Sequence, residues 1–72
     1  MMPYVLVERG IYTKSGKEFV HYFERPGPFF NVITSDPAKA KEFLTVHSAR
    51  RVIKERGLRG FKPERVKAEG RS

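Results

Sequence analysis

The chain opens with two stretches of β-forming residues around a short polar segment. Residues 3–13 and 18–24 carry the β-branched and aromatic side chains, and Lys14-Ser15-Gly16-Lys17 separates them. In the second stretch, alternate positions fall on opposite faces of a strand: Phe19, His21 and Phe23 against Val20 and Tyr22. The pattern predicts an antiparallel hairpin over residues 3–24 that turns at Ser15-Gly16.

Two further strands are predicted after the hairpin. Arg25-Pro26-Gly27-Pro28 ends the second strand, because prolines cannot donate to a ladder. The apolar run of residues 29–33 predicts a third strand, and its strongly apolar character favours a central place in the sheet. Residues 61–66 predict a last strand at an edge, since Pro63 lies within it.

A first helix is predicted directly after the third strand. Asp36 precedes Pro37, and an acidic N-cap followed by proline at the first helical position is a typical helix start. Two turns follow over residues 38–44, with three side chains on one face: Ala40, Phe43 and Leu44. One bent helix over residues 37–56 is the alternative interpretation.

A second helix is predicted over residues 46–56. Thr45 is its expected N-cap. Gly57 fits the left-handed position after a helix, and Leu58 would then contact Ile53 as in a Schellman motif. The helix start and the helix end are therefore both signalled.

The expected order is β-β-β-α-α-β in one small α+β domain, with a mainly antiparallel sheet and the helices on one face. A chain of 72 residues supports a single domain with a small core. We expect the domain to span residues 1–66 and residues 67–72 to form a frayed tail. The six phenylalanines are expected to fill the core. Tyr12 and Tyr22 are candidates for stacking on bases, because a phenol tolerates water.

The charge of the chain is strongly asymmetric. Residues 1–36 hold four basic and four acidic residues, whereas residues 37–72 hold eleven basic and four acidic ones. The whole formal net charge of +7 therefore lies in the second half. This favours a polyanionic partner: a nucleic acid, an acidic protein face or an anionic membrane surface. A solubility role for the charge is the simpler alternative.

The second predicted helix concentrates this charge on one face. At 100° per residue, Val46, Ala49, Val52 and Ile53 form an apolar stripe, which Arg56 joins at the last turn. The opposite face is cationic, with Glu55 only at its margin, and the segment after the helix extends it. The candidate binding residues for nucleic acid or another acidic partner are His47, Arg50, Arg51, Lys54, Arg59, Lys62, Arg65 and Lys67.

The sequence gives no indication of disulfides, metal sites, enzymatic activity or membrane segments. The absence of cysteine excludes disulfides and thiolate metal sites, and His21 and His47 lack paired carboxylates at metal-ligand spacing. We therefore expect no metal, no cofactor and no enzymatic activity. No apolar run approaches a membrane span, and the N-terminus lacks the charged start of a signal peptide. We expect no membrane partner and a cytoplasmic location.

One resemblance bears on function. The stretch Thr34-Ser35-Asp36-Pro37-Ala38-Lys39-Ala40-Lys41-Glu42-Phe43, followed by Ala49 in a second helix and a short strand, resembles small phage and prophage proteins of unknown function, over residues 29–66. That resemblance implies a compact module acting on host proteins or nucleic acids, and no functional residue is carried over. The leading hypothesis is a basic, non-enzymatic nucleic-acid-binding module, monomeric or dimeric through its edge strands. The alternative is a phage-type regulator that binds an acidic host protein, such as a component of the transcription machinery.

Overall fold

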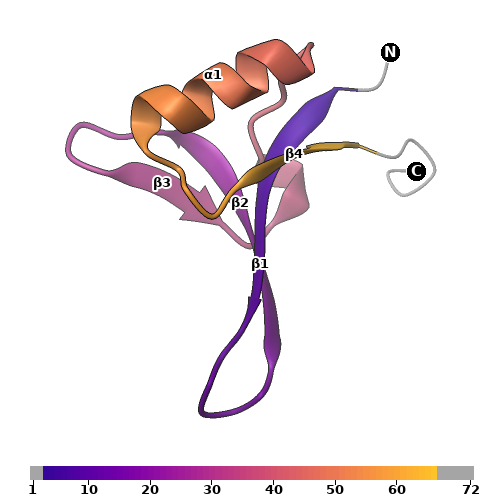
Figure 1. The fold of residues 1–72 in the computed structure, drawn as a ribbon, viewed down its shortest axis with the longest axis vertical. Helices are drawn as coiled ribbons and strands as arrows, with labels where there is room; N and C mark the ends of the chain where they lie inside the picture. Colours follow the sequence, from indigo (N-terminus) through magenta and orange to yellow (C-terminus); the bar gives the residue numbers. More distant parts are fainter. Residues whose placement is uncertain (1–2, 67–72) are drawn as a thin grey trace.

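The fold is a four-stranded antiparallel sheet with one helix across it (Figure 1). A computed structural model describes residues 3–66 of the 72. The strands stand in the order β3-β2-β1-β4. The elements are β1 (Tyr4–Ile11), β2 (Glu18–Pro26), β3 (Asn31–Thr34), the 3₁₀ turn η1 (Pro37–Lys39), α1 (Val46–Arg56) and β4 (Lys62–Arg65). The sequence predicted the α+β class and the antiparallel sheet, but two helices where residues 3–66 contain one α-helix and a 3₁₀ turn.

The hairpin of β1 and β2 is confirmed. Gly16 adopts φ 73°, a left-handed conformation that glycine takes without strain. The turn is closed by the Tyr12 N–H donating to the Lys17 carbonyl at 2.9 Å and the Gly16 N–H to the Tyr12 carbonyl at 2.8 Å. β2 continues through Arg25 to Pro26, two residues beyond its predicted end. It does so because these residues pair with β3 instead of β1.

The predicted third strand is present, but its central place in the sheet and its start at Phe29 are wrong. β3 begins at Asn31, which pairs with Pro26, and it forms an edge of the sheet. The reason is the tight β2–β3 turn, in which a Cβ at Gly27 would collide with the Phe30 carbonyl. Phe29 and Phe30 lie in this turn. They are 92% and 76% exposed, so they do not belong to the core.

The prediction of a helix over residues 38–44 is also wrong, and so is the bent helix over residues 37–56. Asp36 acts as the predicted cap, since its Oδ1 accepts from the Ala38 N–H at 2.9 Å. The turn nevertheless ends at Lys39, and the next residues are not helical. The backbone of Phe43 instead exchanges two hydrogen bonds of 2.7 Å with Tyr4. Pairing with β1 brings the Phe43 ring into the core, which outweighs local helix propensity.

Residues 41–43 also bind to the sheet at a point where its strand pairing is irregular. The pairing of β2 with β3 shifts register between Phe23 and Arg25. At that point the Lys41 N–H donates to the Phe23 carbonyl at 3.0 Å. Residues 41–43 therefore lie beside the start of β1, where β2 no longer pairs with β1.

α1 has the predicted bounds and caps. The Thr45 Oγ1 accepts from the Ser48 N–H at 3.1 Å, and Gly57 adopts φ 67°. The Leu58 N–H donates to the Ile53 carbonyl at 3.0 Å, as in the predicted motif. The predicted apolar stripe holds except at Val46, which is 37% exposed at the first turn.

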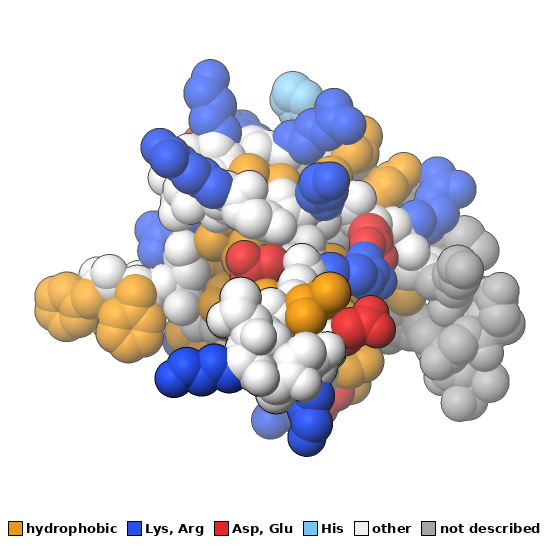
Figure 2. Space-filling model, turned by 60° about the horizontal axis from the view of Figure 1, so that its bottom comes forward, with side chains coloured by type: hydrophobic (Ala, Val, Ile, Leu, Met, Phe, Trp, Pro, Cys, Tyr) orange, Lys and Arg blue, Asp and Glu red, His pale blue; other side chains and the backbone are white. Residues whose placement is uncertain are grey.

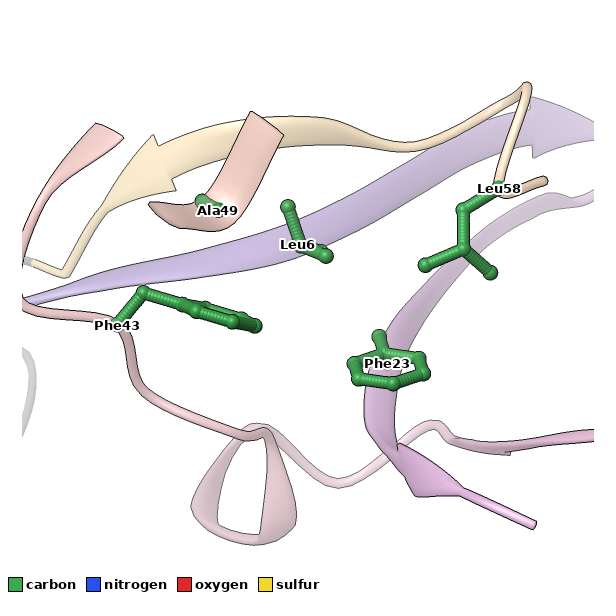
Figure 3. Close-up of a cluster of buried hydrophobic side chains, with 5 residues drawn as sticks. All are labelled: Leu6, Phe23, Phe43, Ala49 and Leu58. Carbon is green, nitrogen blue, oxygen red and sulfur yellow. The ribbon is translucent and has the colours of Figure 1, made fainter. Parts of the chain in front are cut away.

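The core lies between α1 and one face of the sheet (Figure 3). Its buried members are Leu6, Phe23, Phe43, Ala49 and Leu58. Partly buried side chains pack around them: Tyr4, Val52, Ile53 and Phe61. β4 pairs only with β1 and forms the second edge, as Pro63 predicted. The predicted tail over residues 67–72 lies outside the described residues.

Candidate nucleic-acid interface

The outer surface of α1 carries a compact set of cationic residues. We call it the α1 basic face: His47, Arg50, Arg51 and Lys54, all exposed. Ala49 on the opposite side of the helix is fully buried, so the helix is oriented as its amphipathic pattern predicts. Figure 2 shows Lys, Arg and one His projecting from the upper part of the molecule, where Figure 1 places α1.

Most of the α1 basic face is not neutralised by acidic groups. Arg51 pairs with Glu55 at 3.1 Å across one helical turn. Within residues 3–66, no carboxylate lies within ion-pairing distance of Arg50 or Lys54. An exposed i,i+4 pair such as Arg51–Glu55 contributes little to stability. A bound anion can therefore replace Glu55 as the partner of Arg51 at little cost in free energy. The face is therefore available for an anionic ligand.

Arg56 has a structural role instead. Its Nε donates to the Asn31 Oδ1 at 3.0 Å, and its Nη2 donates to the Gly27 carbonyl at 3.1 Å. In return, the Asn31 Nδ2 donates to the Arg56 carbonyl at 3.2 Å, which satisfies an acceptor at the helix end. These bonds fasten the C-terminus of α1 to the β2–β3 turn. The sequence indicated only that Arg56 joins the apolar stripe at the last turn.

Not all of the predicted cations after α1 extend the α1 basic face. Arg59 is exposed in the connection between α1 and β4. Lys62 stands opposite Val7 in register, so it points to the sheet face away from α1. Arg65 donates to the Tyr4 hydroxyl at 3.1 Å and lies 5.5 Å from the centre of that ring. Lys67 lies outside the described residues.

The two predicted stacking tyrosines lie on opposite faces of the sheet. The Tyr12 ring contacts the Phe19 ring, with centroids 4.9 Å apart. Tyr22 instead stands opposite Val7, three positions along β2 from Phe19 and hence on the other face. The two tyrosines therefore cannot belong to one stacking surface. Tyr12 lies on the side of the sheet that carries α1.

A row of rings that the sequence analysis did not identify as a site extends from Tyr12. Phe19 stacks on His21 with centroids 4.8 Å apart and an interplanar angle of 29°. We call Tyr12, Phe19 and His21 the aromatic ladder. The period-2 alternation of β2 already placed Phe19 and His21 on one face. Only the hairpin register brings Tyr12 to them.

Residues 3–66 show neither a metal centre nor a helical membrane span. Residues 3–66 contain no group of three or more side chains arranged to hold a metal ion, although His21 Nδ1 lies 3.7 Å from the Glu8 carboxylate. In that same part of the chain, no helix is long and apolar enough to cross a bilayer. The chain matches no family model, no curated protein and no solved structure.

Proposed function

We propose that the protein is a non-enzymatic nucleic-acid-binding module that contacts phosphates through the α1 basic face. The observation that carries the proposal is the position of Arg50 and Lys54, exposed on one helix face without an acidic partner in residues 3–66. The excess of basic residues in the second half of the chain gives the surrounding field the same sign.

Phosphate binding by this face has a measurable salt signature. Each neutralised phosphate releases condensed counterions, so affinity falls as salt concentration rises. Three contacts, from Arg50, Arg51 and Lys54, give a slope of log K against log salt of about −3 on a duplex and about −2 on a single strand. Fluorescence anisotropy with short labelled DNA and RNA over a salt series measures this slope.

A matched pair of variants tests whether α1 is responsible. Lys54→Gln and Lys62→Gln remove the same charge from exposed positions on opposite sides of the sheet. Lys54→Gln should lower the slope by about one unit and weaken all sequences alike, whereas Lys62→Gln should change it much less. Equal effects from the two variants would show that net charge matters and the α1 basic face does not.

The second candidate is a phage-type regulator that docks on an acidic host protein. The exposed pair Phe29 and Phe30 favours it, because aromatic side chains are enriched at protein interfaces. The β2–β3 turn that carries them is fastened by Arg56, so they are presented without a large ordering cost. Phe29→Ser with Phe30→Ser should abolish binding to such a protein and leave nucleic-acid affinity unchanged.

A further inference from the structure

The aromatic ladder has one closed end and one open end. At the closed end, His21 faces Glu8 at 3.7 Å, and the next residue on that face of β2 is Phe23 in the core. At the open end, Tyr12 is 51% exposed and contacts the ladder through Phe19. A further planar ring can therefore extend the row only beyond Tyr12.

The ladder is held in place by the strand that it crosses. Gly10 stands opposite Phe19 in register, and a Cβ at Gly10 would collide with the Phe19 ring. The ring thus lies across the bare backbone of β1, as aromatic residues do when they cover a glycine in a sheet. Phe19 in turn supports Tyr12 from one side. The Tyr12 ring thus has a packing partner before any ligand arrives, which lowers the ordering cost of stacking.

Cations lie close to the open end. Lys17 is tied to Tyr12 across the hairpin by the 2.9 Å backbone hydrogen bond, and Lys14 lies in the same turn; both side chains are exposed. Glu18, the acidic residue that follows Lys17, stands opposite Ile11 and points to the other face. An aromatic ring flanked by flexible cations is the combination that binds a base together with its phosphate.

We propose that Tyr12 is a stacking site for one base of a single-stranded nucleic acid, with Phe19 as its positioning residue. The proposal rests on the proposed function and specifies its ligand, because a base paired inside a duplex does not offer its face to an outside ring. The hairpin tip and α1 lie at opposite ends of the long axis of the molecule, whose extent is 39 Å (Figure 1). A strand long enough to reach both engages Tyr12 with a base and the α1 basic face with phosphates.

The experiment compares Tyr12→Ala with Ile11→Ala. Ile11 is the adjacent residue, is 63% exposed and points to the other face of the sheet, which makes it a matched control. Anisotropy is measured with 12-nucleotide dT, 12-nucleotide rU and an abasic DNA strand of equal length. Tyr12→Ala should weaken dT and rU binding about fivefold or more, the loss expected for one stacked base. Abasic binding should not change, Ile11→Ala should affect no ligand, and Tyr12→Phe should keep the wild-type affinity.

The outcomes separate this proposal from the proposed function. Unchanged dT and rU affinity in Tyr12→Ala, with abasic binding still weakened by Lys54→Gln, overturns the stacking site and leaves α1 as the phosphate-binding element. An equal loss on dT and on the abasic strand also overturns it, since the ring would then act without a base. A base-dependent loss of affinity in Tyr12→Ala, without any effect of Lys54→Gln, supports the stacking site and contradicts phosphate binding by α1. No binding of any strand overturns both.

Discussion

The two faces of the sheet differ in how they bury their apolar residues. On one face, α1 and the segment after it cover Leu6 and Phe23. On the other face no α-helix of the described residues 3–66 is packed, yet Val5 and Val7 are buried. Their neighbours in register are long side chains of the adjacent strands: Tyr22, Lys62 and Glu64. One face is therefore covered by a second layer, whereas on the other the cross-strand neighbours of Val5 and Val7 are long side chains that can lie along the sheet.

The two faces of the sheet also differ in their charged and aromatic side chains. The α1 basic face and the aromatic ladder both lie on the helix-bearing side. The opposite side carries the ion pair of Arg9 with Glu64, in which the Arg9 Nη2 donates to the Glu64 Oε1 at 3.0 Å. On that side Arg9 is paired and Lys62 is not, whereas on α1 only Arg51 has an ion-pair partner within residues 3–66.

The largest effect is expected on the helix-bearing side. Phe23→Ala should lower the free energy of unfolding by about 3–5 kcal/mol, because it removes a fully buried ring from the centre of the core. In a domain of this size that is a large fraction of the total, so the variant should be partly unfolded at 25 °C. Urea denaturation followed by circular dichroism measures the loss. A loss below about 1 kcal/mol would mean that α1 does not seal the core.

A smaller effect is expected from Val7→Ala on the opposite side. Its side chain is buried without a helix above it, and deleting two methyl groups there should cost about 1–2 kcal/mol. The neighbouring strand side chains can collapse into the space more easily than a packed core can. A cost equal to that of Phe23→Ala, measured in the same urea titration, would remove the distinction between the two faces.

The ion pair of Arg9 with Glu64 should contribute less than about 1 kcal/mol. Its side chains are about half exposed, so water and salt screen the attraction. A double-mutant cycle of Arg9→Ala and Glu64→Ala, read from thermal unfolding at low and high salt, gives the coupling energy. A coupling above about 2 kcal/mol that resists salt would show that the pair is effectively buried.

The smallest change in stability is expected from the charge variants used to test binding. Lys54→Gln and Lys62→Gln should each alter the free energy of unfolding by less than about 0.5 kcal/mol, since neither side chain has an ion-pair partner within residues 3–66. Thermal melts of both proteins check this. A clear loss in Lys54→Gln alone would mean that its binding defect reports unfolding.

Local signals in the sequence predict the hairpin and α1 well, because each is specified at both ends. Gly16 and Gly57 take the positive φ angles that their contexts require, and Thr45 caps the helix as expected. The segment after Asp36 shows the limit of such signals. A cap starts one turn there, but pairing of Phe43 with Tyr4 is a long-range event that no local pattern reveals.

The candidate site, too, could be predicted from the sequence only in part. Helical periodicity places Arg50, Arg51 and Lys54 on one exposed face, and the structure has them there. Periodicity gives no information about the face to which Lys62 points, because that depends on its register with β1. The sequence likewise did not indicate that Phe29 and Phe30 are exposed, since composition alone assigns phenylalanine to the core.

The pairing of β1 with β4 has a practical consequence for protein engineering. The Val66 N–H donates to the Pro3 carbonyl at 2.8 Å, so the first and last described residues are direct neighbours. A short linker can join them, and the chain can be reopened in the exposed turn at Ser15-Gly16. Such a circular permutant keeps every strand pairing of the sheet and places its new termini at the hairpin tip, beside Tyr12. A fluorophore attached to a new terminus would then report directly on ligands that reach this end of the molecule.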